Sequence, residues 1–265
     1  MYLCKDYKAD AMKYIEELHE LKIFHKKDVV ALTKDENAAK EILRRYKKQR
    51  LISQVRRDLY VVTDLASKAS LPSKFEIAGH ITPSSYLSYH AALEYYGLAN
   101  QVFYELYISS KEAFNNFDYE GISYTFCQSK SKIGVVSPFT DSLIRVTDLE
   151  RTILDCINRI DLSGGLEELV ECFAIVTYIN ENKLLEYLQH FDKQVLYQKV
   201  GFILSYFQKE MKLSTAFFEL CKSKIGKSTR YLTDKQESNT YFKEWKLCAP
   251  ENILSFLEQG GSEYV

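Results

Sequence analysis

Residues 33–50 read TKDENAAKEILRRYKKQR, and residues 51–62 read LISQVRRDLYVV. The apolar residues of the first stretch recur every three or four positions, which predicts an amphipathic helix reaching about Gln49. Thr33 or Asp35 is a suitable N-cap for this helix. The second stretch has two short β-prone runs around a polar turn, which is typical of a hairpin. A helix followed directly by a hairpin decides the fold that we expect for the N-terminal part.

The expected helix divides into two faces when its residues are placed about 100° apart around the axis. The apolar face, which should pack, consists of Ala38, Ala39, Ile42, Leu43 and Tyr46. The opposite face is polar and mostly cationic and consists of Asn37, Lys40, Glu41, Arg44, Lys47 and Lys48, with Arg45 at its flank. An α-helix of this width fits the major groove of duplex DNA.

Two further helical signals precede this stretch, at about Asp10–Leu21 and at about Lys26–Leu32. Two helices joined by a turn as short as the one after residue 32 match the helix-turn-helix pattern. A hairpin directly after such a pair would be the wing of a winged helix, with Arg56 and Arg57 along the phosphate backbone or in the minor groove. The sequence therefore predicts an α+β fold that starts with a winged helix-turn-helix domain over residues 1–63.

Charge is distributed unevenly along the chain. Residues 1–62 hold 15 Lys and Arg against 10 Asp and Glu, a net +5, so the remainder carries −6 within a total of −1. Residues 40–57 alone hold 8 basic residues and 1 acidic residue. A basic block at one end of an otherwise acidic chain indicates a polyanionic partner.

The expected contacts with DNA divide by position along the helix. Exposed residues near the start of a recognition helix reach base edges, so we expect base contacts from Asn37, Lys40 and Arg44. Lys47 and Lys48 lie further along and are expected to meet phosphates. On an isolated helix such a face would most often be only solvated, and its combination with three helices and a basic hairpin favours double-stranded DNA as the partner. The full set of expected DNA contacts is Asn37, Lys40, Arg44, Arg45, Lys47, Lys48, Arg56 and Arg57.

Residues 64–265 are expected to form a regulatory domain, mixed α/β over about 64–160 and largely helical over about 161–265. Strands are expected at Val102–Ile108, Ile122–Cys127 and Ile133–Val136. Helices are expected at Ser84–Tyr96, Thr147–Arg159, Leu166–Ile179, Lys183–His190, Lys193–Glu210 and Ser214–Lys222. Gly260-Gly261-Ser262 is interpreted as a frayed tail.

The chain lacks strong signals for catalysis, and no metal ion, cofactor or catalytic residue is expected. The five histidines include no pair at metal-binding helical spacing, and no phosphate-binding glycine loop is present. Asp148, Glu150 and Asp155 could form a metal or acid–base site, but helix capping and dipole compensation explain them better. A second polar group consists of Ser84, Ser85, Ser88 and His90. The start of a helix with a polar face explains this group better than a catalytic nucleophile and base do.

Localisation is expected to be cytoplasmic. No stretch approaches the ~20 apolar residues of a membrane span, and Met1–Asp10 has no apolar run of the kind found in signal peptides. The six cysteines are scattered without a Cys-x-x-Cys pair, which favours free thiols in a reducing compartment.

Three segments of the chain resemble a known family. They are Arg56-Arg57-Asp58-Leu59-Tyr60, Tyr86–Leu93 closing on Tyr96-Gly97-Leu98, and Val146–Asp155. Their order is similar to that of the AbiEi-family antitoxins of bacterial abortive-infection toxin–antitoxin operons. The resemblance runs from about residue 10 to about residue 180, and more loosely to Trp245-Lys246-Leu247. The family often has glycine where this chain has Asp58, and aspartate tolerates turn conformations.

The resemblance implies a transcriptional autorepressor and antitoxin. In that family the winged helix binds inverted-repeat operator DNA, and the C-terminal domain neutralises a nucleotidyltransferase-like toxin. Two alternatives stay open: a protein-binding module with a degenerate winged helix that contacts the toxin directly, and an enzyme acting on nucleotides through the Asp148, Glu150 and Asp155 cluster. Both dimers and paired monomers can fill an inverted repeat, so the oligomeric state is also open.

Overall fold

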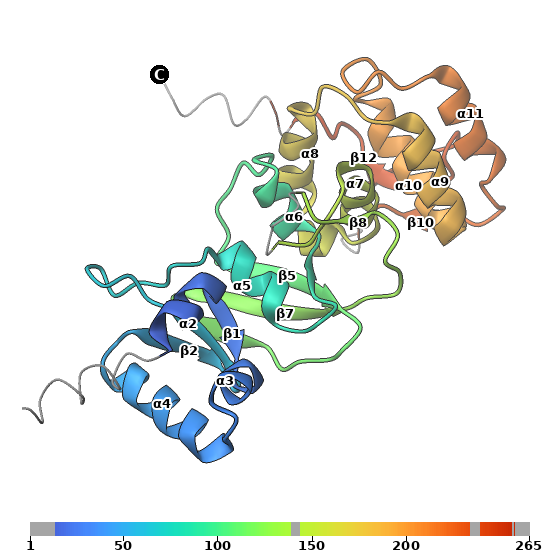
Figure 1. Ribbon diagram of the computed structural model, residues 1–265. Helices are drawn as coiled ribbons and strands as arrows, with labels where there is room; N and C mark the ends of the chain where they lie inside the picture. The colour runs from blue at the N-terminus through green and yellow to red at the C-terminus, as the bar shows by residue number, and fades with distance from the viewer. Residues whose placement is uncertain (1–13, 139–143, 234–238, 256, 258–265) are drawn as a thin grey trace, which may run out of the picture.

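The computed structural model describes residues 14–138, 144–233, 239–255 and 257. Over these residues the fold is mixed α+β, with three separate β-sheets and three clusters of buried apolar side chains. The N-terminal elements lie at one end of the molecule and the C-terminal helices at the other, with the largest sheet between them (Figure 1). None of the described helices is long and apolar enough to cross a lipid bilayer.

Within residues 14–62, the described elements of the N-terminal part are three helices and a small sheet. Its elements are, in chain order, α2 (Ile15–Leu21), β1 (Ile23–His25), α3 (Lys26–Thr33), α4 (Glu36–Lys48), β2 (Ile52–Arg56) and β3 (Leu59–Val62). The three strands pair in the order β1-β3-β2 and are all antiparallel. The first helix was expected from Asp10, and residues 10–13 lie outside the described residues; within them the helix begins at Ile15.

α4 forms where the sequence predicted it. The Asp35 side chain caps its start by accepting a hydrogen bond from the Ala38 backbone N–H at 2.6 Å. Its buried residues are Ala39, Ile42, Leu43 and Tyr46. The prediction that Ala38 also packs is wrong, because this residue sits in the first turn of α4 and is exposed.

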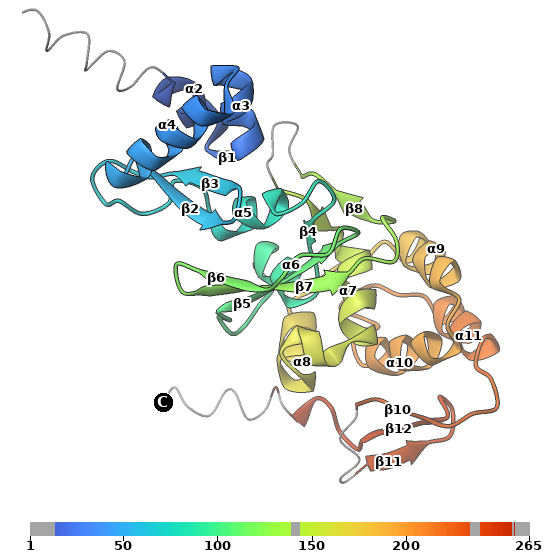
Figure 2. The same ribbon diagram turned by 90° about the horizontal axis from the view of Figure 1, so that it is seen from below.

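The small sheet is apolar on both faces, and this joins the N-terminal part to the rest of the chain. Tyr60 and Val62 of β3 pack in the cluster under α4, whereas Leu59 and Val61 pack with side chains from beyond residue 63. This alternation follows from the two-residue period of a strand. α4 therefore lies on one side of β2 and β3, and the large sheet on the other (Figures 1 and 2).

The largest sheet has six strands in the order β6-β7-β5-β4-β9-β8. They are β4 (Tyr86–Leu87), β5 (Glu105–Ser110), β6 (Phe117–Tyr119), β7 (Ile122–Gln128), β8 (Val135–Val136) and β9 (Val146–Thr147). β5 and β7 run parallel and pair over six residues. Two short helices belong to the same region, α5 (Lys74–His80) and α6 (His90–Tyr95). A capping box between Ser73 and Glu76 defines the start of α5.

The prediction of a helix over Ser84–Tyr96 is wrong for the first half of that range. Tyr86 and Leu87 instead form β4, which pairs with β5 and β9. Tyr89 has a positive φ of 55°, so α6 begins only at His90. The pairing partners of β4 lie more than 20 residues away in the sequence, and helical spacing over a short segment cannot reveal them. The strand expected at Val102–Ile108 is displaced for the same reason and spans Glu105–Ser110.

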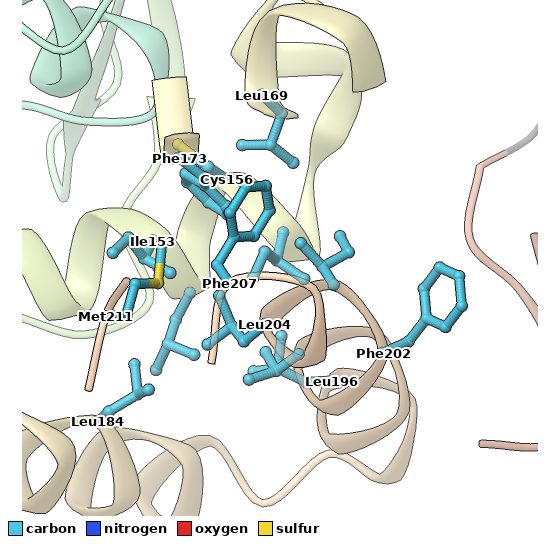
Figure 3. Close-up of a cluster of buried hydrophobic side chains, with 14 of the residues drawn as sticks. Ile153, Cys156, Leu169, Phe173, Leu184, Leu196, Phe202, Leu204, Phe207 and Met211 are labelled. Atoms are coloured by element: carbon cyan, nitrogen blue, oxygen red, sulfur yellow. The ribbon is translucent and has the colours of Figure 1, made fainter. Parts of the chain in front are cut away.

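Five helices build the C-terminal core: α7 (Leu149–Asn158), α8 (Leu166–Ala174), α9 (Glu181–Phe191), α10 (Gln194–Ser205) and α11 (Thr215–Ser223). A 3₁₀ turn over Ile160–Ser163 joins α7 to α8. Figure 3 shows side chains from α7, α8, α9 and α10 meeting in one apolar cluster. α8 and α10 end before the predicted Ile179 and Glu210.

The C-terminal part also holds a sheet that the helical prediction missed. Its strands are β10 (Arg230–Tyr231), β12 (Leu247–Pro250) and β11 (Asn239–Phe242), in this order. Just before β12, the ring of Trp245 packs against Gly201 of α10 so closely that a Cβ at Gly201 would lie 2.0 Å from it. Strands of two to four residues carry too little periodicity to be recognised in a sequence. The predicted tail at residues 260–262 lies outside the described residues.

Candidate nucleic-acid interface

α4 presents its cationic side chains to solvent. The exposed fractions of the Lys40 and Arg44 side chains are 57% and 73%. Asn37, Lys47 and Lys48 are also exposed. Arg45 is half-buried, and its guanidinium carbon lies 5.5 Å from the centre of the Tyr46 ring. The polar face expected from the sequence is thus placed outward by the packing of Ala39, Ile42, Leu43 and Tyr46.

The carboxylates that pair with this surface come from α4 itself. Glu36 pairs with Lys26 at 2.7 Å and with Lys40 at 3.3 Å, and these two lysines lower the pKa of Glu36. Glu41 pairs with Arg44 at 2.8 Å. These pairs are exposed, so their attraction is weak and screened by salt.

The acidic remainder of the chain leaves this surface open. Among the described residues, no carboxylate from residues 64–265 forms an ion pair with Lys40 or Arg44. Over the same residues, neither Lys47 nor Lys48 forms an ion pair with any carboxylate. Exposed lysines and arginines whose ion pairs are weak can exchange those pairs for phosphates.

Lys47 connects α4 to the hairpin. Its ammonium group donates a hydrogen bond to Gln54 Oε1 at 2.7 Å and lies 5.9 Å from the centre of the Tyr60 ring. Gln54 is exposed on β2 and was not among the expected contacts. Strand alternation places Gln54 on the same face as Ile52, which packs under α4, so its position beside that helix could have been read from the sequence.

The turn between β2 and β3 consists of Arg57 and Asp58. The Arg57 side chain is 92% exposed, and its Nε lies 3.6 Å from Asp58 Oδ2. Asp58 has a positive φ of 63°, a conformation that aspartate and asparagine tolerate better than most residues. Arg57 therefore occupies the hairpin tip, as the sequence predicted.

Arg56 does not share that position, and this corrects the expectation of a pair of arginines at the tip. Its guanidinium carbon lies 5.5 Å from the centre of the Phe114 ring and 5.3 Å from that of Phe117. Its Nη1 is buried without a hydrogen-bond partner in the described part of the chain, and burial lowers the pKa of the group. A β-bulge between Gln54 and Arg56 interrupts the alternation of β2, and Arg56 packs on the same side as Val55, toward the large sheet.

The two arginines should therefore respond differently to truncation. Arg57→Ala is expected to reduce the slope of log affinity against log salt by about 1, the effect of losing one phosphate contact, with an unchanged melting temperature. Arg56→Ala is expected to lower the melting temperature, because it removes cation–π packing, and to leave the salt slope nearly unchanged. Titrations of duplex DNA at several salt concentrations, with thermal melts of both variants, measure this; equal salt slopes for the two would contradict the assignment.

The acidic cluster after β9 caps and braces helices. Asp148 accepts the Arg151 backbone N–H at 3.0 Å and also bonds to Lys183 at 3.1 Å and to the Tyr187 hydroxyl at 2.7 Å. Asp155 pairs with Arg151 at 2.8 Å. Among the described residues no group of His, Cys, Asp and Glu has the arrangement of a metal site. These contacts agree with the interpretation that the acidic cluster caps a helix and forms ion pairs.

The serine and histidine group is likewise held by structural contacts. Ser88 Oγ bonds to Ser109 Oγ at 2.8 Å, and Ser84 Oγ bonds to the side chains of Ser110 and Glu112. His90 Nε2 bonds instead to Glu168 at 3.0 Å. Within the described residues no serine of this group bonds to His90, so a nucleophile and base are not assembled there.

Comparison with known proteins finds similarity to solved structures. No protein-family model matches the chain, and no curated protein matches it. The crystal structure of the RV2827C protein from Mycobacterium tuberculosis aligns with a TM-score of 0.64 at 13% sequence identity. The alignment covers 95% of this chain and 94% of that one, so the two share their fold over nearly the whole length.

Proposed function

We propose that residues 14–62 form a winged helix-turn-helix that binds duplex DNA, with α4 in the major groove and the β2–β3 hairpin as the wing. The observation that carries this proposal is the exposed cationic face of α4. α3 and α4 are joined by only Lys34 and Asp35, the short connection of a helix-turn-helix. Base contacts are assigned to Asn37, Lys40 and Arg44, near the start of the helix.

Phosphate contacts are assigned to the remaining cations of the same surface. Lys47 and Lys48 lie in the last turn of α4, and Arg57 lies at the hairpin tip. Arg45 is half-buried at the flank of the helix and is also assigned a phosphate contact. Arg56 is left out of the set because its guanidinium packs on phenylalanine rings.

We further propose that the protein is a transcriptional autorepressor and antitoxin of a bacterial toxin–antitoxin operon. The support is the resemblance of three sequence segments to AbiEi-family antitoxins. On this proposal the protein acts in the cytoplasm, its DNA target is an inverted-repeat operator, and its other partner is a nucleotidyltransferase-like toxin bound or countered by the C-terminal part.

Salt dependence tests the DNA-binding proposal. Affinity for a duplex containing the region upstream of the gene is expected to fall linearly on a double-logarithmic plot, with a slope of about −0.9 for each phosphate neutralised. Fluorescence anisotropy titrations at several salt concentrations between about 50 and 200 mM measure the slope. Binding that is indifferent to salt, or absent for every duplex tested, would overturn the proposal.

A protein-binding module is the second candidate function. Four exposed apolar side chains outside the α4 surface favour it: Val102, Tyr104, Ile175 and Tyr178. Tyrosine, which supplies two of the four, is enriched at protein interfaces. Co-purification with the neighbouring operon product, together with no affinity for DNA, would select this candidate over the first.

A further inference from the structure

A cavity of about 580 Å³ lies between the six-stranded sheet and α7, and the α9–α10 junction forms its third side. Figures 1 and 2 both show α7 close to α10. The volume is within the range of about 300–1,000 Å³ that is typical of small-ligand sites. Neither the α4 surface nor the contacts of the capping cluster account for this cavity.

The floor of the cavity is polar. Tyr107 and Ser109 of β5 pair with Thr125 and Cys127 of β7, and all four line the cavity together with Tyr86 of β4. Leu106 and Ile108 alternate with Tyr107 and Ser109 along β5, face the opposite side of the sheet and are fully buried. A face of hydroxyls and aromatic rings can donate and accept hydrogen bonds and is therefore suited to a polar ligand.

The hydroxyls of this floor are held in place by their neighbours. Tyr107 and Thr125 both donate to Glu105, at 3.0 and 2.7 Å. The Tyr86 hydroxyl bonds to Ser129 at 2.9 Å. Within the described residues the Tyr89 hydroxyl forms no hydrogen bond, and it remains available to a ligand. Groups positioned before binding lose little entropy when a ligand arrives.

Aromatic rings supply the flat surfaces of the cavity. The rings of Tyr89 and Tyr107 meet edge to face at 6.5 Å, and Phe191 lines the opposite side beneath the guanidinium of Arg151. Tyr89 holds its position with φ 55° and ψ −135°, a backbone conformation that side-chain-bearing residues rarely adopt. Such local strain concentrates at ligand sites.

Cations outnumber carboxylates around the cavity. The lining holds Lys130, Arg151, Arg159 and Lys193 against the single carboxylate of Asp155. Asp155 is paired with Arg151 at 2.8 Å, and Arg159 is paired with Asp161 at 2.6 Å.

Two exposed lysines of the lining are left over. Lys130 follows β7, and Lys193 precedes α10. Among the described residues, neither forms an ion pair within 4.0 Å. Burial raises the pKa of Asp155, and Lys193 is near enough to oppose that rise in part. Unpaired ammonium groups at the mouth of a polar, ring-lined cavity suit a phosphate or another compact anion.

We propose that this cavity is a binding site for a small anion that carries a planar ring, of the size and chemistry of a nucleoside monophosphate. The ring lies among Tyr89, Tyr107 and Phe191, the sugar hydroxyls meet the polar floor, and the phosphate is held by Lys130 and Lys193. The site is distinct from the α4 surface and does not depend on DNA binding.

Calorimetric titration of the full-length protein with AMP, GMP, CMP and UMP tests the site. At least one of the four is expected to bind with a dissociation constant below about 1 mM. The nucleoside of that nucleotide lacks the phosphate, and ribose 5-phosphate lacks the base. Each is therefore expected to bind at least about tenfold more weakly. No binding by any of the four nucleotides overturns the proposal, as does equal binding of the nucleoside or of ribose 5-phosphate.

Variants locate the site. Lys130→Ala with Lys193→Ala is expected to weaken nucleotide binding at least about tenfold, and Asn158→Trp, which fills the cavity from α7, is expected to abolish it. Lys111→Ala with Lys209→Ala removes the same charge from exposed positions outside the cavity and should leave binding unchanged. Arg44→Glu on α4 should also leave it unchanged. If the α4 variant loses nucleotide binding and the Lys130 and Lys193 variant retains it, the cavity is not the site.

Discussion

Replacing Arg44 and Lys48 by glutamate together is expected to lower the affinity for duplex DNA by at least about a hundredfold at fixed salt. The change removes two exposed cations from α4 and adds two anions to a helix face that already carries Glu41. Arg44→Glu also leaves Glu41 without its 2.8 Å partner, so repulsion of the phosphates increases further. A base contact contributes about 1–3 kcal/mol, and repulsion adds to its loss.

Stability should change little in this double variant. Glutamate is a good helix former, and Lys48→Glu opposes the helix dipole by only a few tenths of a kcal/mol. Lys111→Glu with Lys209→Glu makes the same change of charge at exposed positions far from α4 in the sequence and is the matched control. Anisotropy of labelled duplex and circular dichroism measure binding and folding; an equal loss of affinity in both double variants would attribute the effect to net charge and sink the assignment to α4.

Glu168→Ala is expected to lower the free energy of unfolding by about 3–5 kcal/mol, the size typical of breaking a buried polar pair. Glu168 and His90 are both 1% exposed. Glu168 Oε1 accepts from His90 Nε2 at 3.0 Å and from the backbone N–H groups of Asn100 and Gln101 at 3.0 and 3.2 Å. The Cys172 thiol also donates to this oxygen, at 3.4 Å. Alanine at this position leaves all four donors without their acceptor, and a buried unsatisfied donor costs about 1–3 kcal/mol.

Two comparisons separate this effect from general damage to α8. Glu168→Gln keeps the acceptor oxygen and the volume, so its loss should be clearly smaller than that of alanine. Glu167→Ala changes the exposed neighbour in the same helical turn and should be within about 0.5 kcal/mol of the natural protein. Urea titrations followed by circular dichroism provide the measurement. Similar losses for Glu167→Ala and Glu168→Ala would show that the pair does not hold α6, α8 and the loop between residues 97 and 104 together.

Some parts of the N-terminal region follow from local sequence alone. The spacing of apolar residues in α4 placed its end within one residue, and it separated buried Ile42 and Leu43 from exposed Lys40 and Arg44. Its start was left between two N-cap candidates, Thr33 and Asp35, and the structure uses Asp35. The cap at Asp35 and the turn at Asp58 were also readable. Each of these features depends on contacts between residues a few positions apart, and the local sequence pattern predicts such contacts.

Other features depend on residues far apart in the chain. Arg56 packs on Phe114 and Phe117, a contact across nearly sixty residues that no local pattern contains. β4 exists because β5 and β9 flank it, and without them Ser84–Tyr96 has only the spacing of a helix.

The division between the two kinds of feature has one physical cause. The helices and turns of this protein are encoded by periodicity and by caps, which act over one or two turns of chain. The six-stranded sheet, the His90–Glu168 pair and the cavity between the sheet and α7 arise only when distant segments pack. Burial and hydrogen bonding between such segments outweigh local preference by several kcal/mol, and only the tertiary structure reveals where they do so.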